Sequence, residues 1–441
     1  MANAGGNGVI FEVEAGRLDF ALPRMVPVEQ RLEVLREEDV AGAVRRELGK
    51  LAGQLSPGAR VAVGVGSRGL ADLPLLVRAC VSELRRQGLD PFLIPAMGSH
   101  GGATSEGQLE VLAGYGLTPD SMGVEIRAGM EVDLIGRLAD GTAVYFSREA
   151  LAADAVLPLN RVKMHTAFRG PVESGLSKML AIGFGKHKGA ASLHQKGSEE
   201  FGWVVPQAAA LILERVPVIG GLASVENGLE QVGRLEFVPG PLIPSREPEL
   251  LDLSRRLMPR IPFTGLDLLV VDRIGKDLSG DGMDPNVTGR HPTARMTDPE
   301  RDPRRLVALR ASEQTHGNLC GLGVADLTTA ALVDQIDYQQ TWTNTVTSLE
   351  LALGKTPMWV GDDRTAIALA LSSLSGVVPI DARVARISST LHLQRLWVSE
   401  ALWEAEGPGR EDVWSVGEPR DMEFDTAGHL VDLPRPSRRR R

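Results

Sequence analysis

The chain has 441 residues, of which 43% are hydrophobic and 24% charged, as in ordinary globular proteins. That length exceeds one ordinary core, so we expect two domains. The net charge of −9 argues against a nucleic-acid partner, because such a partner requires a basic face. Only residues 435–441 form a basic block, which we expect to be a disordered, solvated tail.

The cysteine content and the N-terminal sequence indicate the cellular compartment of the protein. Cys80 and Cys320 are too few for a disulfide framework or a thiolate metal site. The N-terminus has no charged segment followed by an apolar one, and no run of about 18 apolar residues occurs. We therefore expect a cytoplasmic protein with no membrane partner.

The first part of the chain has the pattern of alternating strands and helices. Residues 1–25 alternate apolar and polar residues as strands do, and residues 28–55 have a helical pattern. A β-α-β unit follows, with two strands flanking an amphipathic helix, at residues 60–66, 73–86 and 91–98. Thr104 or Ser105 is expected to cap the next helix. This alternation favours parallel sheets, whose ligands bind beyond the carboxyl ends of the strands.

The rest of the chain predicts a second α/β unit. The segment MPRIP at 258–262 marks a boundary, and LDLLVVD at 266–272 opens the second unit. We expect two α/β domains with mostly parallel sheets, 1–258 and 259–441, with the active site in a cleft between them. The other expected strands are a mostly β section at 124–146 and strands at 155–159, 216–226, 234–240, 305–311 and 384–390. The other expected helices are at 174–182, from there to residue 194, and at 203–214, 245–257, 329–335 and 344–353.

Gly64 to Gly69 matches the pattern G-x-G-x-x-G between a strand and a helix, the form of a dinucleotide-binding turn. The alternative is a tight strand-to-helix turn. The next strand ends in MGSH at 97–100, without the acidic residue that a ribose requires, so a standard NAD site is not expected. Arg68 in this turn is placed to bind a carboxylate or a phosphate.

Residues 161–196 collect polar side chains that a core would not bury unpaired: His165, Lys178, His187 and His194. His165 follows a strand, as does His100 in the sequence GSHGG, and both positions favour proton chemistry over core filling. His187 lies in the basic turn GKHKG and is expected to face solvent.

Two of these residues suggest a modified amine and a metal ligand. Lys178 is either a surface lysine or an amine that is modified or binds substrate. His194 is the better candidate for a metal ligand, but an ordinary zinc site needs three or four protein ligands. Most ligands of a metal here would therefore have to come from something other than side chains.

This combination resembles the nickel-dependent lactate racemase family. The resemblance implies a nickel-pincer nucleotide, a pyridinium mononucleotide whose sulfur and carbon atoms ligate nickel. It implies that Lys178 tethers the nucleotide as a thioamide and that His194, sixteen positions later as in the family, completes the coordination of nickel. His100 and His165 match the family's paired acid/base histidines, and Arg68 matches the arginine that binds the substrate carboxylate. Candidates for the nucleotide phosphate are Ser174, Ser177 and Lys186.

The resemblance implies a racemase or epimerase of a small-molecule 2-hydroxy acid, with cofactor-biosynthesis enzymes as partners. Hydride transfer from C2 to the cofactor avoids a carbanion beside the carboxylate, while paired histidines handle the hydroxyl proton. The spacer between His165 and Lys178 is three residues longer than in the family. A tyrosine-glutamine pair and a lysine, which bind substrate in lactate racemases, are matched here only by Lys276. The substrate is therefore expected to differ from lactate.

The loop after residue 272 leaves the substrate open. It carries polar residues that could bind the extra hydroxyls of a sugar acid or could simply order the loop: Asp277, Asp281, Asp284 and Asn286. The same fold could also act as a dehydratase or redox enzyme on such an acid. A non-enzymatic carrier of the nickel cofactor is a further alternative, although a carrier needs neither acid/base histidines nor an arginine for a carboxylate.

Overall fold

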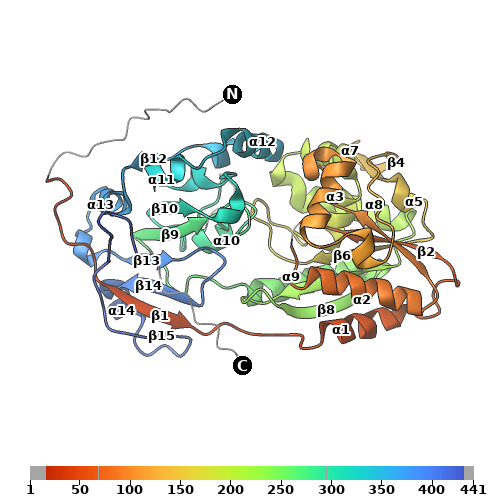
Figure 1. The fold of residues 1–441 in the computed structure, drawn as a ribbon, viewed down its shortest axis with the longest axis horizontal. Coiled ribbons are helices and arrows are strands. Elements are labelled where there is room, and N and C mark those ends of the chain that lie inside the picture. Colours follow the sequence, from red (N-terminus) through yellow and green to blue (C-terminus); the bar gives the residue numbers. More distant parts are fainter. Residues whose placement is uncertain (1–15, 68, 294–295, 297, 432–441) are drawn as a thin grey trace. The chain divides into compact units, whose positions relative to one another are not determined.

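The computed structural model describes residues 16–67, 69–293, 296 and 298–431. They form two compact units. One is Glu33–Met258, and the other combines the described residues up to Leu32 with those from Pro259 onward. Both units are mixed α/β with mostly parallel sheets, as predicted from the sequence (Figure 1). The predicted basic tail and residues 1–15 lie outside the described residues, and the strand predicted from the alternation at 17–22 is wrong, because the first strand begins at Met25. Within the described part, no helix is long and apolar enough to cross a membrane.

The five-strand unit, Glu33–Met258, is built on a sheet ordered β3-β2-β6-β7-β8. The first four of these are parallel neighbours, and β8 runs antiparallel to β7. A separate hairpin, β4-β5, belongs to the same unit. The strands are β2 (Arg60–Val65), β3 (Asp90–Pro95), β4 (Val132–Arg137), β5 (Ala143–Ser147), β6 (Ala155–Arg161), β7 (Gly220–Glu226) and β8 (Val232–Pro239).

Both faces of this sheet are buried, which explains why its strands are apolar at nearly every position. Val61, Val63 and Leu93 pack on one face with helices α1 and α2, which lie side by side in Figure 1. Ala62 and Ile94 face the other side, in a core that includes α8 and α9. The helices are α1 (Val40–Leu48), α2 (Leu73–Arg86), α3 (Ser105–Gly114), α4 (Pro119–Met122), α5 (Arg148–Leu151), α6 (Leu176–Lys178), α7 (Lys186–His194), α8 (Phe201–Arg215) and α9 (Ile243–Leu257).

Helix α2 has the bounds predicted from the sequence, and the Thr104 side chain caps α3 by accepting from the amide of Gly107 at 3.1 Å. The predicted helical region at 28–55 is wrong for much of its length, because only Val40–Leu48 forms an α-helix there. The predicted linker helix is instead part of the fold, since α9 buries Leu250 and Leu251 in the core.

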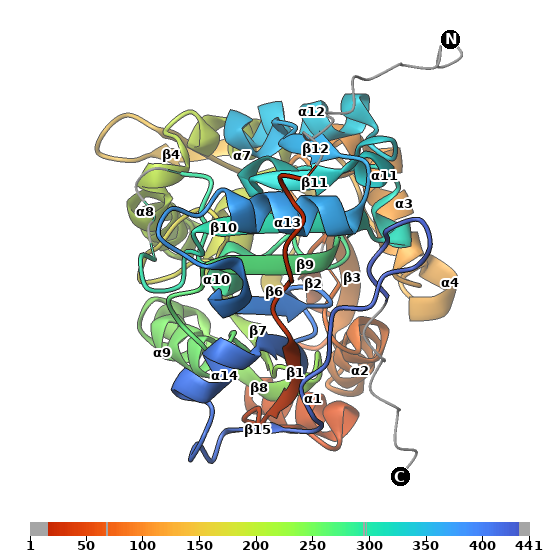
Figure 2. The ribbon, with the colours of Figure 1, turned by 90° about the vertical axis from the view of Figure 1, so that its left-hand side faces the viewer.

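The eight-strand unit has a sheet ordered β12-β11-β10-β9-β13-β14-β1-β15. The first five strands are parallel, and the last three pair antiparallel. Figure 2 shows α13 lying across β9 and β10, which it covers with Ile367 and Leu371. The helices and strands of the eight-strand unit are β1 (Met25–Gln30), β9 (Leu268–Ile274), α10 (Pro285–Thr288), β10 (Arg305–Ala311), β11 (Leu327–Thr329), α11 (Ala330–Val333), α12 (Tyr338–Ser348), β12 (Met358–Val360), α13 (Asp363–Ser372), β13 (Val384–Ile387), β14 (Arg395–Ser399), α14 (Glu400–Glu406) and β15 (Val413–Ser415).

Strand β1 differs from the predicted domain division, which placed residues 1–258 together. It pairs with β14, with Met25 opposite Ser399, and so belongs to the sheet of the C-terminal segment. Val26 and Val28 are buried in this position. The pairing joins residues far apart in the chain, and a local hydrophobic pattern does not specify such a partner.

A buried ion pair in the eight-strand unit provides a stability test. Arg386 and Asp272 form a two-pronged pair at 2.8 and 2.9 Å with both side chains buried. Asp272→Ala leaves the arginine charge uncompensated and should lower the free energy of unfolding by about 3–5 kcal/mol, measured by urea denaturation. Glu400→Gln breaks the exposed pair with Arg24 and should cost about 1 kcal/mol or less. Equal losses for both variants would contradict this assignment.

Candidate functional site

The histidines predicted to exchange protons, His100 and His165, lie beyond the carboxyl ends of strands in the five-strand sheet. His100, Ser67 and His165 follow β3, β2 and β6, which are adjacent parallel strands. The chain runs from β2 to β3 on one side of β2, whereas β6 and then β7 lie on its other side. The strand order therefore reverses direction between β2 and β6. Ligands of such sheets bind beyond the carboxyl ends of the strands at this position.

The turn after β2 is not built as a dinucleotide-binding loop. Gly64 stays within the strand, and a Cβ at this position would lie 2.3 Å from the ring of Phe184, so the glycine makes room for that ring. Helix α2 begins only at Leu73, four residues after Gly69. Arg68, the predicted carboxylate ligand, lies outside the described residues.

His100 is held by its ring and by its backbone. The Nδ1 atom lies 2.5 Å from Oγ of Ser67, whose carbonyl accepts a hydrogen bond from the Tyr115 hydroxyl at 3.0 Å. The side-chain amide of Gln108 donates to the carbonyls of Gly98, at 3.0 Å, and of His100, at 3.4 Å.

Lys186 stabilises the same loop through hydrogen bonds of its amine. Its side chain is fully buried, and its amine donates to the Pro95 carbonyl at 2.7 Å and to Oε1 of Gln108 at 3.1 Å. Burial lowers the pKa of this amine to about 8. The position does not suit the predicted contact with a cofactor phosphate, and we assign Lys186 to the support of the His100 loop instead.

The loop that carries His165 is fixed by a buried carboxylate. The amide of His165 donates to Oε2 of Glu173 at 2.6 Å, and Oε1 of Glu173 pairs with Arg255 at 2.7 Å. The amide of Ala167 donates to Nδ1 of His165 at 3.0 Å. Ser174 exchanges backbone hydrogen bonds with Lys163 at 2.9 and 3.1 Å.

Lys178 ends α6, and the chain continues directly into a π-helical turn at Met179–Gly183. Such turns are rare and occur often at functional sites. Helix α6 has no capping side chain of its own. The buried Glu247 supplies one from α9, because its Oε2 accepts from the amide of Ser177 at 2.9 Å and from the Ser177 hydroxyl at 2.5 Å. The hydroxyl of Ser177 is therefore directed into the core rather than toward a phosphate.

Phe168 and Phe201 pack against the side chains of three site candidates. The Lys178 amine lies 5.4 Å from the ring centroid of Phe168, and the His165 ring lies 4.4 Å from the same ring. Phe168 packs edge-on against Phe201 at 5.5 Å, and Phe201 packs against His194 at 4.9 Å. His165, Lys178 and His194, separated along the chain, are thus brought into one cluster.

The imidazole of His194 has a lowered pKa. Burial, and secondarily the charge of Lys178, lower the pKa of its imidazole from 6.5 to about 4. The ring is therefore neutral near pH 7, as a metal ligand must be. The described residues contain no group of three or more histidine, cysteine or acidic side chains that could hold a metal. An amine beside one neutral imidazole fits a group that is tethered to lysine and brings most of its own metal ligands.

The predicted substrate loop lies in the eight-strand unit and is held by its own contacts. The amine of Lys276 donates to the carbonyl of Gly280, and Asp277 accepts from the hydroxyl of Ser312. Asp284 accepts from the amide and side chain of Asn286, at 3.0 and 2.8 Å, and caps α10. These contacts favour the alternative in which the polar residues order the loop.

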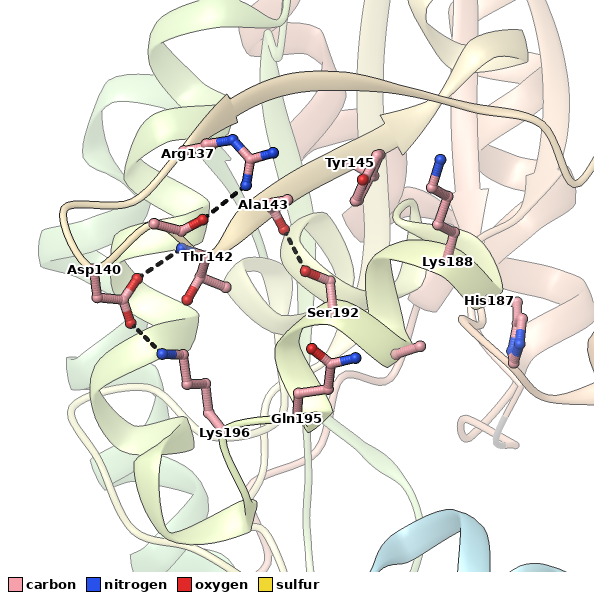
Figure 3. A pocket seen from close by; sticks show the side chains of 12 residues that line it. Arg137, Asp140, Thr142, Ala143, Tyr145, His187, Lys188, Ser192, Gln195 and Lys196 are labelled. Atoms are coloured by element: carbon pink, nitrogen blue, oxygen red, sulfur yellow. Dashed lines mark hydrogen bonds and ion pairs between the residues drawn. The ribbon is translucent and has the colours of Figure 1, made fainter.

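A polar groove of about 730 Å³ lies between the β4-β5 hairpin and α7 (Figure 3). Arg137, Lys188 and Lys196 line it, and Lys196 pairs with Asp140 at 2.7 Å. Among the described site candidates only His187, which is exposed, lines this groove. The groove is therefore separate from the cluster around Lys178.

Solved structures of low sequence identity share this fold. The lactate racemase apoprotein from Thermoanaerobacterium thermosaccharolyticum matches with a TM-score of 0.51 and 12% identity, over 86% of this chain and 95% of that chain. A protein from Thermotoga maritima matches with a TM-score of 0.50 and 13% identity, over 82% and 99%. No family model and no curated protein matches the sequence. At these identities the comparison establishes a lactate racemase-like fold, and the chemistry rests on the residues themselves.

Several supporting residues have no signal in the sequence. Glu247 reads as one of several charged residues of a surface helix, and Gln108 and Ser67 read as ordinary polar positions. Each becomes identifiable only when the fold brings it to a partner distant in the chain. The glycine at 175 is a partial signal, since a Cβ there would lie 1.9 Å from Oε1 of Glu247.

The titration of Glu247 predicts a pH dependence of stability. Burial raises the pKa of its carboxyl from 4.5 to about 7, so folding favours the protonated form. The associated stability is fully present below about pH 4.5 and is lost as the pH rises through 7. Between these limits the parent should lose about 3 kcal/mol relative to Glu247→Gln, measured by urea denaturation across that range. Glu249→Gln changes an exposed residue of the same helix and is the matched control. Its free energy of unfolding should change with pH as that of the parent does. A parent and Glu247→Gln with parallel pH profiles would refute the assignment.

Proposed function

We propose that the protein is a racemase or epimerase that inverts C2 of a 2-hydroxy acid with a nickel-pincer nucleotide. The observation that carries the proposal is the cluster in which Phe168 and Phe201 link the Lys178 amine to the imidazole of His194. The His165 ring reaches the same cluster through Phe168. The fold shared with a lactate racemase apoprotein supports this reaction class.

In this proposal the chain holds the cofactor with two side chains. Lys178 provides the nitrogen of the covalent tether, and His194 provides a lone pair to nickel. When bound, the cofactor supplies a reversible acceptor for the C2 hydrogen and its electron pair. Phe168 lies against the amine and Phe201 against the imidazole, so both polar groups have an aromatic ring on one side.

The remaining residues act on the substrate. As the C2–H bond breaks, the hydroxyl proton must leave, and histidines near neutrality suit this transfer. His100 and His165 serve the substrate hydroxyl in this proposal, and Arg68 binds the carboxylate. Lys276 remains a candidate for a further substrate contact. The substrate is proposed to be a 2-hydroxy acid other than lactate.

The tether and nickel can be tested directly. Protein produced together with cofactor-making enzymes should show an added mass of cofactor size and nickel near one per chain. Lys178→Ala should lose the added mass, because the tethering nitrogen is gone, as measured by intact mass spectrometry and metal analysis. Lys188→Ala, in the separate groove, is the matched control and should keep both. Unmodified, nickel-free parent protein that still turns over a 2-hydroxy acid would refute the proposal.

The histidines should separate by function. His100→Ala and His165→Ala should each lower C2 inversion by about 10²–10⁴-fold, the range expected for proton-transfer groups, without loss of nickel. His194→Ala should instead lose nickel. Chiral analysis of the product and metal analysis measure both effects. Nickel loss from either of the first two variants would show that the roles are divided wrongly, and loss of water instead of C2 inversion would indicate a dehydratase.

A further inference from the structure

The loop that carries His100 packs against the π-helical turn that directly follows Lys178. The amide of Gly98 in the loop donates to the carbonyl of Gly183 in the turn at 3.2 Å. A Cβ at position 183 would lie 2.5 Å from the carbonyl oxygen of Ala96, so only glycine permits this approach. Backbone therefore contacts backbone between the segment of the proposed tether and the loop of a proposed acid/base group.

Lys186 makes a second connection between these two segments. It begins α7, shortly after the turn, and its buried amine donates to the carbonyl of Pro95, at 2.7 Å, and to Oε1 of Gln108, at 3.1 Å. The side-chain nitrogen of Gln108, which is also buried, donates to the carbonyls of Gly98 and His100, at 3.0 and 3.4 Å. Lys186 thus reaches the backbone of His100 through a single side chain.

The ammonium of Lys186 determines which way the side-chain amide of Gln108 is turned. A lysine cation can only donate hydrogen bonds, so it must face the amide oxygen. The amide nitrogen is then directed toward the loop, where the carbonyls of Gly98 and His100 accept its hydrogens. Without the amine, the opposite orientation no longer brings two donors together, and the loop carbonyls can lose this donor.

The position of Lys186 is unfavourable for a lysine. Its φ of +52° lies in the left-handed region, which strains residues other than glycine. Its side chain is fully buried, whereas lysines are almost never fully buried unless they are paired. Burial lowers the pKa of the amine only to about 8, so the cation is still the main form at pH 7. An apolar side chain would fill the same space without desolvation of a charge, so the need to fill space does not explain this lysine.

We propose that Lys186 is a positioning residue, which through Gln108 holds the imidazole of His100 in place relative to Lys178. The amine exchanges no proton with the substrate, and His100 and His165 both keep the acid/base roles proposed above. The consequence for catalysis rests on the proposed function, because it requires a cofactor on Lys178. Proton transfer depends on this geometry, since a displacement of about 1 Å can lower a rate about 10²-fold.

The position of His100 can be tested without cofactor or substrate. In cofactor-free protein labelled with ¹⁵N-histidine, Lys186→Met should change the ring signals of His100, which are identified by their absence from His100→Gln. Gln108→Glu keeps an acceptor for the amine but lacks the donor to the loop, so it should change the same signals. Lys188→Met removes an exposed amine from the same helix and is the matched control. Its His100 signals should equal those of the parent.

Unchanged His100 signals in Lys186→Met or in Gln108→Glu would overturn the proposal. Should Lys186→Met fail to fold, Gln108→Glu decides, because that variant keeps the buried amine and an acceptor for it. Equal changes in Lys188→Met would also overturn it, because they would show that the loss of any positive charge on α7 affects His100.

In the loaded enzyme, Lys186→Met should lower kcat for C2 inversion about 10²-fold and leave KM unchanged, because the amine does not contact the substrate. The added mass and the nickel content should stay at the parent values, since Lys178 and His194 are intact. Lys188→Met should match the parent in all of these quantities. A parental kcat in Lys186→Met, or a loss of activity that follows a loss of nickel, would overturn the positioning role.

The two measurements separate this proposal from the proposed function. If the loaded parent shows no C2 inversion, the proposed function fails, and the NMR comparison still decides whether Lys186 and Gln108 hold His100 in place. If the parent inverts C2 while the His100 signals do not change in the variants, only the positioning role fails.

Discussion

The hydrogen bonds from Ser177 to the carboxylate of Glu247 anchor the helix on which the proposed site depends. The first turn of a helix has unpaired amides, and the carboxyl group of Glu247 accepts a hydrogen bond from one of them. Here the carboxylate arrives from α9 through the core, which requires the small residue Gly175 beside it. The direction of α6, and with it the position of Lys178, follows from this contact.

The surroundings of Lys178 also affect His194, the proposed metal ligand. Phe168 contacts the amine and the ring of His165, and Phe201 contacts the ring of His194, so apolar rings lie among the polar groups of the cluster. In such surroundings a second charge is costly, which keeps His194 neutral next to a cationic lysine. The same arrangement that disfavours a protonated imidazole favours a metal with ligands of its own. The packing of two rings thus selects the kind of cofactor that the proposed function requires.

Much of the five-strand unit could be predicted from the sequence, because α2, the strands around it and the Thr104 cap are specified by local pattern. The candidates His165, Lys178 and His194 were found because polar residues among glycines and small residues are conspicuous. Their supports were not, since Glu247 meets Ser177 and Gln108 meets Lys186 only through the tertiary fold. Lys186 is an example. A lysine in a glycine-rich segment resembles a phosphate ligand until its burial is known.

The pairing of β1 with β14 and β15 has a consequence for the topology of the whole chain. The eight-strand unit starts before the five-strand unit and finishes after it, so the latter is an insertion between Leu32 and Pro259. The ends of the insertion lie side by side, because Glu33 pairs with Arg256 at 3.2 Å. In the host, Gln30 donates to the Arg260 carbonyl at 2.9 Å. A segment inserted through adjacent ends can be excised without interrupting the host sheet, so the inserted unit, which contains Lys178 and His194, is a separable module of the chain.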